Sequence, residues 1–139
     1  SYDSKNNRSE KIIINKTPFI LDAYNANPTS MGVALDSFCD KYSTNNLVIL
    51  GDMFELGKQT FTEHENILNK CLSLGITKIF TIGSNFMSTK VNNKRIEKFA
   101  NIEQFIDSFA KFKIHFESVL IKGSRSMKLE KLIPFFKSL

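Results

Sequence analysis

The chain has 139 residues, of which 42% are hydrophobic and 24% are charged, and its formal net charge is +5. This length predicts one globular domain with a real core and leaves little room for a second. No apolar run approaches the roughly eighteen residues of a transmembrane helix, so we expect no membrane insertion. The lysines are dispersed instead of forming a stripe with interleaved aromatics, which argues against a nucleic-acid-binding domain.

Thirteen phenylalanines and no tryptophan predict a core filled largely by phenylalanine and aliphatic side chains. Cys39 and Cys71 lie within helical apolar patterns, so we interpret them as reduced core residues, which fits a cytoplasmic protein. The only histidines are His64 and His115. We expect a surface or supporting position for His64 and a structural or exposed one for His115. Two scattered histidines and two core cysteines argue against a zinc site.

Apolar runs and helical periodicity place the elements along the chain. Residues 1–10 are polar and read as a linker. Strands are expected at 11–15, 17–21, 47–50, 78–82, 95–99 and 118–122, the first two forming a hairpin. Helices are expected at 28–42, 62–75, 102–112 and 126–136, with a short one around 86–91. This alternation predicts an α/β domain with a Rossmann-like, open, mostly parallel sheet and helices on both faces.

The expected helix over 62–75 has local signals at both of its ends. Thr62 and Glu65 have the spacing of a capping box at its start. Gly75 fits the left-handed position that commonly closes a helix.

The turn between the second strand and the first helix carries more polar groups than a helix start needs. Asn27 fits the N-cap position and Pro28 the first helical turn. The same turn also holds Asp22, Tyr24, Asn25 and Ser30. This surplus of polar side chains predicts a ligand-binding site in the turn.

Three strands end in glycine followed by a small polar residue, at Gly51-Asp52, Gly83-Ser84 and Gly123-Ser124. Ligands of open α/β sheets bind at the carboxyl ends of the strands, where glycine lets the backbone approach closely. The turn after residue 21 lies at the same edge, so we expect a binding edge there. The alternative is that these glycines only end strands.

Lys122, Ser124 and Arg125 place two cations and a hydroxyl beside the expected start of the last helix, where an anion is favoured. The alternative is that Ser126 caps the helix and both cations are solvated. The chain contains no phosphate cradle of its own. Between Gly51 and Gly57 lie five residues instead of four, and Gln59 replaces the hydroxyl of a P-loop. A complete ATP-driven enzyme within this chain is therefore not expected.

These segments together resemble the carboxyl-terminal domain of the Mur ligases. The resemblance rests on 22–31 (DAYNANPTSM), 50–57 (LGDMFELG) and 122–127 (KGSRSM) with Leu129-Glu130, and it spans essentially the whole chain. The segment Asn6–Ser9 matches the arginine-bearing hinge of that family. Residues 1–10 would thus be a hinge from a preceding central domain, and 11–139 the carboxyl-terminal domain. One departure is Ser126, where many relatives have glycine.

The resemblance implies one lobe of a cytoplasmic bacterial ligase of peptidoglycan synthesis. ATP would phosphorylate the carboxylate of UDP-MurNAc-tripeptide, and the amine of D-Ala-D-Ala would attack the acyl phosphate to form an amide. Magnesium and the P-loop would belong to the central domain. The chain's partners would be these substrates and the enzyme's own central and amino-terminal domains, and the isolated chain would be inactive. A free-standing Rossmann-like module for a nucleotide or an anionic partner is the alternative.

Carried over by position, the resemblance assigns no catalytic or metal-binding residue to this chain. Arg8 would contact the ATP phosphates and Asp22 the ribose hydroxyls. The remaining nucleotide-binding residues would be Tyr24, Asn25 and Asn27, although Asn27 could serve only as a cap. The substrate-binding residues would be Ser30, Lys122, Ser124 and Arg125. Asp52 and Glu55 would order their loop.

Overall fold

The structure is a computed structural model and describes residues 9–112 and 115–139. Its strands are β1 Glu10–Ile14, β2 Thr17–Asp22, β3 Asn46–Gly51, β4 Lys78–Ile82, β5 Ile96–Phe99 and β6 Ser118–Lys122. Its α-helices are α2 Pro28–Lys41, α3 Thr60–Ser73, α4 Ser84–Met87, α5 Ile102–Phe109 and α6 Leu132–Lys137. Short 3-10 turns span Gly57–Gln59, Arg125–Met127 and Leu129–Lys131.

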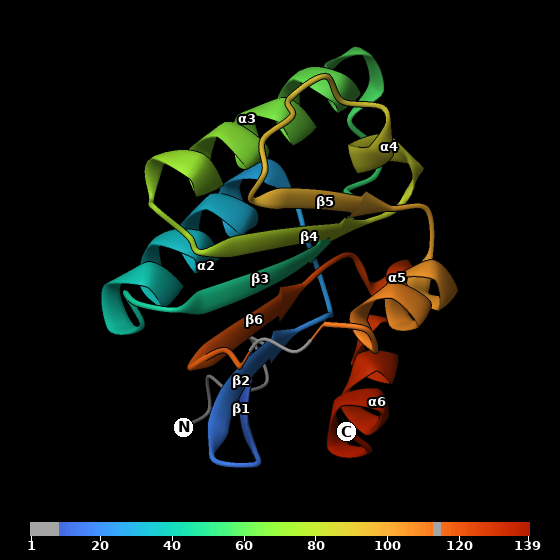
Figure 1. Cartoon of the computed structure of the whole chain (residues 1–139). Coiled ribbons are helices and arrows are strands. Elements are labelled where there is room, and N and C mark those ends of the chain that lie inside the picture. The colour runs from blue at the N-terminus through green and yellow to red at the C-terminus, as the bar shows by residue number, and fades with distance from the viewer. Residues whose placement is uncertain (1–8, 113–114) are drawn as a thin grey trace.

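The strands form one six-stranded sheet in the order β1-β2-β6-β3-β4-β5 (Figure 1). Only β1 runs antiparallel to its neighbour; the other pairs are parallel. Asn15 and Lys16 both have positive φ, as a tight hairpin turn requires. The predicted hairpin and the mostly parallel sheet are confirmed. The order places β6, the last strand of the chain, between β2 and β3.

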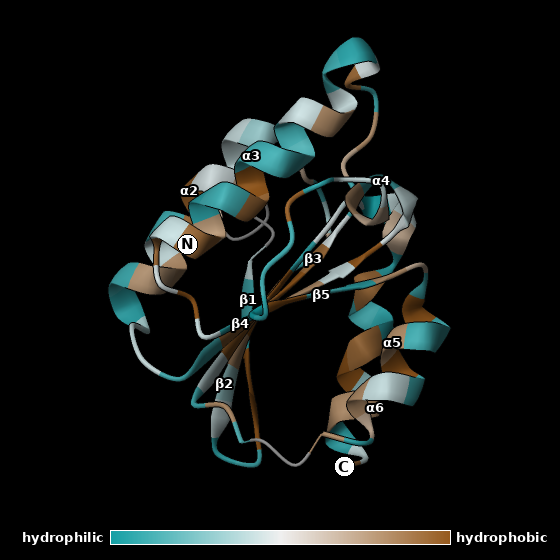
Figure 2. Cartoon of the chain, turned by 45° about the horizontal axis from the view of Figure 1, so that its top comes forward, coloured by the Kyte–Doolittle hydropathy of each residue, from teal (hydrophilic) through white to brown (hydrophobic). Residues whose placement is uncertain are grey.

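Helices cover both faces of the sheet, with α2 and α3 on one side and α5 and α6 on the other (Figures 1 and 2). Side chains alternate between these faces along each strand. In β3, Leu47 and Ile49 join the core under α5 and α6, whereas Val48 and Leu50 join the core under α2 and α3. The central strands β3, β4 and β6 are buried on both faces, so each contributes to both cores.

Phenylalanine dominates the core under α5 and α6, as the composition predicts. Phe80 lies at its centre, and its ring centroid is 5.4–5.8 Å from those of four other phenylalanines, namely Phe99, Phe105, Phe109 and Phe112. Most of these pairs meet edge to face, the geometry that aromatic quadrupoles favour. Cys71 is buried in the opposite core and Cys39 is partly buried; both are free thiols.

The start of α3 differs from the predicted capping box. The helix begins at Thr60, two residues earlier than expected, and Gln59 at its N-cap makes no side-chain capping bond. Glu65 instead accepts a hydrogen bond from the backbone N–H of Lys90 at 2.8 Å. The box was wrong because a 3-10 turn already leads into the helix and a distant segment binds Glu65. The predicted closure at Gly75 is confirmed by its φ of +74°.

The last predicted helix is also shorter than expected. Lys128 adopts a left-handed φ of 55° and separates two 3-10 turns, so that α6 begins only at Leu132. The break lets Leu129 enter the core, where it is completely buried. The short helix near residue 86 spans Ser84–Met87, and α5 ends at Phe109 instead of residue 112. No helix in the described part of the chain is long and apolar enough to cross a membrane.

Candidate functional site at the carboxyl edge of the sheet

The turn between β2 and α2 is closed by a reciprocal cap. The Asn27 side chain accepts a hydrogen bond from the Ser30 backbone N–H at 2.8 Å, and the Asn27 N–H donates to the Ser30 hydroxyl at 3.0 Å. Pro28 occupies the first turn of α2, where its missing N–H has no helical acceptor to lose. Asn27 therefore caps α2 as the sequence predicts, and Ser30 is its partner.

Asp22 is the last residue of β2, and its register partner in the neighbouring parallel strand is Lys122, the last residue of β6. Register partners of parallel strands project from the same face, so the two side chains meet. The Lys122 ammonium lies 2.8 Å from Asp22 Oδ2 and also donates to the backbone carbonyl of Asn25 at 2.9 Å.

This ion pair is secluded from solvent. The side chain of Lys122 is only 2% exposed and that of Asp22 is 14% exposed. The resemblance assigns Lys122 to the peptide substrates; in this structure its amine points inward to the turn after β2.

A second contact joins the same two turns nearer the surface. The Arg125 guanidinium donates to the Tyr24 hydroxyl at 3.1 Å and lies over the Tyr24 ring, 4.9 Å from its centroid. Both residues bear on a small surface cleft with Glu130. Tyr24 and Arg125, assigned from the sequence to different ligands, thus form one cation–π pair.

The loop after β3 completes the edge. The Ser124 hydroxyl donates to the backbone carbonyl of Asp52 at 2.9 Å. The Asp52 carboxylate accepts the backbone N–H groups of Asn85 and Phe86 at 2.8 and 2.9 Å, so it orders the start of α4. Burial raises the pKa of the Asp52 carboxyl, and the two amide bonds oppose this effect.

The strand-end glycines make room for protein side chains in this structure. A Cβ on Gly123 would lie 2.6 Å from Leu129 Cδ1, and a Cβ on Gly51 would lie 3.0 Å from the same atom. A Cβ on Gly83 would lie 2.2–2.5 Å from the carboxylate atoms of Asp52. We expected these glycines to admit a ligand to the backbone; instead, their open space is filled by Leu129 and Asp52.

The predicted helix start beside Ser124 is absent from this position. Ser124 precedes a 3-10 turn and makes no side-chain capping bond, and Ser126 lies inside that turn. The anion-attracting helix end expected next to Lys122 was therefore wrong. Any anion binding by this segment would rest on the Arg125 side chain, because the single O–H of Ser124 is already donated to the Asp52 carbonyl.

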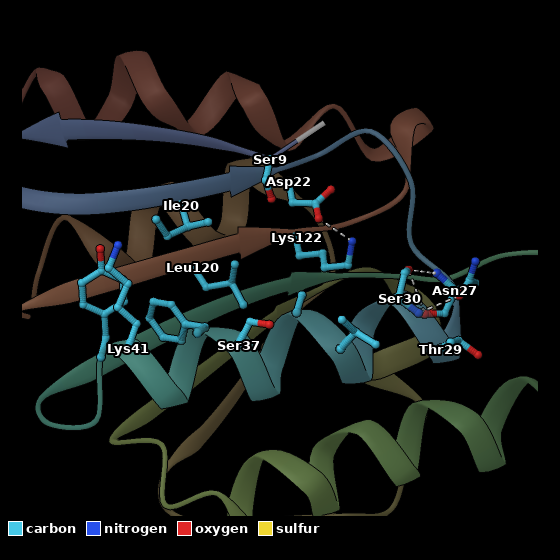
Figure 3. A pocket seen from close by; sticks show the side chains of 14 residues that line it. Ser9, Ile20, Asp22, Asn27, Thr29, Ser30, Ser37, Lys41, Leu120 and Lys122 are labelled. Carbon is cyan, nitrogen blue, oxygen red and sulfur yellow. Dashed lines mark hydrogen bonds and ion pairs between the residues drawn. The ribbon is translucent and has the colours of Figure 1, made fainter. Parts of the chain in front are cut away.

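A cleft of about 590 Å³ opens between α2 and the β2–β6 pair (Figure 3). Asp22, Lys122 and the Asn27–Ser30 cap lie at one end, and Lys41 lies at the other. Ile20 and Leu120 contribute apolar side chains between these ends. The cleft combines an apolar wall with a carboxylate that has acceptor capacity beyond its bond to Lys122, a combination that suits a flat, partly polar ligand.

His64 lies behind this edge, and of the surface and supporting positions that the sequence left open it takes the supporting one. It is completely buried, its Nε2 accepts the Met53 N–H at 3.0 Å, and its Nδ1 lies 2.6 Å from the Thr60 carbonyl. The imidazole therefore anchors the loop that follows Asp52. No local sequence signal marked it, because the loop that it holds is eleven residues away. His115 is exposed.

The remaining site residues are placed as follows. Arg8 lies outside the described residues. Asn25 contributes its carbonyl to Lys122, and Glu55 has a left-handed φ of 63° in the loop after Asp52. Within residues 9–112 and 115–139, no group of three or more histidine, cysteine, aspartate or glutamate side chains could hold a metal ion.

Comparison with known proteins now decides the family. A model of the Mur ligase glutamate ligase domain matches residues 7–125. The chain belongs to the Mur ligase family. UDP-N-acetylmuramoyl-tripeptide–D-alanyl-D-alanine ligase of Rickettsia prowazekii is 33% identical over 133 residues, which cover 94% of this chain and 30% of that protein. The chain thus spans about 30% of the length of this Mur ligase relative.

Solved Mur ligase structures share the fold. MurF from Acinetobacter baumannii matches with a TM-score of 0.84 and 24% identity, over 96% of this chain and 30% of that one. MurF from Thermotoga maritima, solved in complex with ADP, matches with a TM-score of 0.74 and 15% identity, over 95% of this chain and 30% of that one. The α/β architecture predicted from the sequence is confirmed as that of a Mur ligase domain.

Proposed function

We propose that this chain is the carboxyl-terminal lobe of an ATP-dependent ligase that adds D-Ala-D-Ala to UDP-MurNAc-tripeptide. Residues 1–10 would form the hinge from a central domain, and 11–139 the lobe itself. The observation that carries the proposal is the edge at which the β2 turn and the β6 turn meet through Asp22–Lys122 and Tyr24–Arg125. Family membership and the names of the relatives support the substrates.

The nucleotide would lie against the β2 turn. A carboxylate can accept hydrogen bonds from both hydroxyls of a diol, so Asp22 would bind the ribose. Tyr24, Asn25 and Asn27 would lie beside it. Arg8 would reach the phosphates, since guanidinium groups bind phosphate in a fork geometry. The ADP complex of the Thermotoga relative supports a nucleotide in this family. Magnesium would be held by the central domain, because this lobe offers no ligand cluster among its described residues.

The peptide substrates would lie against the β6 turn. Arg125 would provide a cation for a carboxylate. Ser124 would hold the turn through its bond to the Asp52 carbonyl, and Ser30 would lie near the mouth of the cleft. The lobe would bind and orient its substrates. The acyl phosphate and the amide would form between the lobe and the central domain. Such an enzyme acts on nucleotide-linked precursors in the bacterial cytoplasm, where we place it.

Ligation by the full-length enzyme tests this function. Asp22→Ala should lower the rate of amide formation roughly tenfold to a hundredfold, the range set by losing a hydrogen bond to a charged group. The thermal unfolding curve should still show a folded protein. The isolated 139-residue chain should neither hydrolyse ATP nor form the amide. Wild-type turnover in Asp22→Ala would contradict the nucleotide assignment.

A further inference from the structure

Lys122 is the most deeply buried cation among the ion pairs of the described residues. Its side chain is 2% exposed, whereas the lysines of the Lys70–Asp36 and Lys78–Glu97 pairs are 35% and 17% exposed. Burying an ion pair costs so much desolvation that apolar replacements of similar shape are often as stable. Stability is therefore a weak reason for this pair, and its position at the binding edge suggests another.

The ammonium of Lys122 fixes two acceptors that belong to one turn. It bonds the Asp22 carboxylate at 2.8 Å and the Asn25 carbonyl at 2.9 Å, so the carboxylate and the turn backbone share one rigid donor. Only Oδ2 of Asp22 receives this bond, and a carboxylate has about four lone-pair sites on its two oxygens. The bond therefore orients the carboxylate without using its capacity to accept a diol.

We propose that Lys122 is a positioning residue of the nucleotide site, which holds the Asp22 carboxylate in the orientation that a ribose diol requires. This inference rests on the proposed function, because it presumes that Asp22 contacts the ribose. Lys122 would then count among the nucleotide-binding residues instead of the residues that bind the peptide substrates. A preorganised carboxylate binds without first losing side-chain freedom, so the loss of Lys122 should weaken nucleotide use specifically.

The test measures steady-state ligation by the full-length enzyme with ATP and with 2′,3′-dideoxy-ATP, which lacks both ribose hydroxyls. Lys122→Met should lower kcat/KM for ATP roughly tenfold to a hundredfold and leave the KM for D-Ala-D-Ala unchanged. With dideoxy-ATP the variant and the wild type should differ by less than about twofold, because the contact that Lys122 positions is already missing. If Lys122 had only a structural role, Lys122→Met would lower kcat/KM for ATP and for dideoxy-ATP by the same factor.

Lys78→Met provides the matched control. Lys78 also pairs with a carboxylate, Glu97 at 3.0 Å, but at the amino end of β4, away from the binding edge. This variant should use both nucleotides as the wild type does. If Lys122→Met fails to fold, Lys122→Gln should fold because its amide keeps a donor, and its shorter side chain should still lower the preference for ATP, although by less than Lys122→Met would.

Each contradictory outcome has a separate meaning. A Lys122 variant that raises the KM for D-Ala-D-Ala instead of that for ATP would overturn the positioning role and return Lys122 to the peptide site. The wild type should have a lower kcat/KM for dideoxy-ATP than for ATP. If Asp22→Ala abolishes this difference while Lys122→Met and Lys122→Gln keep it in full, the positioning role alone is overturned. Equal use of ATP and dideoxy-ATP by the wild type would refute the proposed ribose contact, and the positioning role with it.

Discussion

Gly83→Ala should destabilise the domain by about 3–5 kcal/mol, because two costs combine at this residue. Gly83 has φ 127° and ψ 160°, a region that is essentially restricted to glycine and costs other residues about 1–3 kcal/mol. The new Cβ would also lie 2.2 Å from Asp52 Cγ. Moving that carboxylate weakens its bonds to the Asn85 and Phe86 amides, and a bond to a charged group contributes about 1.5–3 kcal/mol.

Urea unfolding of the 139-residue chain measures this cost, and Gly32→Ala is its control. Gly32 lies inside α2, and the nearest atom to its added Cβ is Lys70 Cε at 3.9 Å. Alanine is favoured over glycine within helices by about 0.5–1 kcal/mol, so the control should gain stability. A free energy of unfolding for Gly83→Ala within 1 kcal/mol of wild type would refute the reasoning about Asp52.

Two further predictions concern the cap of α2 and the buried thiol. Asn27→Ala should cost about 1 kcal/mol of unfolding free energy, and a loss below about 0.3 kcal/mol would show that the capping bond is not formed. Burial raises the pKa of Cys71 to about 12 and also raises the pKa of the partly buried Cys39, so native iodoacetamide labelling at pH 8 should modify Cys39 slowly but leave Cys71 unmodified until denaturant is added. Because the folded protein holds this thiol proton more tightly, the stability that it contributes is complete below the ordinary thiol pKa and is lost as pH rises towards 12. Mass spectrometry and pH-dependent unfolding check these outcomes.

Local patterns predicted the elements whose formation depends on local forces. Continuous apolar runs identified β3, β4 and β6, and the Asn27-Pro28 pair located the start of α2 within a residue. The order of the strands could not be predicted, because the insertion of β6 between β2 and β3 depends on pairings far apart in sequence, such as Phe19 with Val119 and Asn46 with Ser118. The Asp22–Lys122 pair follows from that insertion.

Tertiary packing overrode the local patterns where predictions were wrong. The helical spacing over 126–136 is real, but Leu129 fills the space beside Gly51 and Gly123. The expected helix is interrupted at Lys128, whose left-handed backbone allows this packing. The sequence could not decide between a surface and a supporting position for His64, because its bond to the Met53 amide of a preceding loop is a tertiary contact. Such contacts leave no periodic signal in the sequence.

The most direct test of the ligase-lobe function is the kcat/KM of the full-length enzyme for ATP and for 2′,3′-dideoxy-ATP, measured by amide formation in the wild type and in Asp22→Ala. The wild type should prefer ATP roughly tenfold to a hundredfold, the range expected for hydrogen bonds to a carboxylate. Asp22→Ala should use both nucleotides equally, at the low rate of the wild type with dideoxy-ATP. A variant that keeps the full preference for ATP would contradict the placement of the ribose at Asp22.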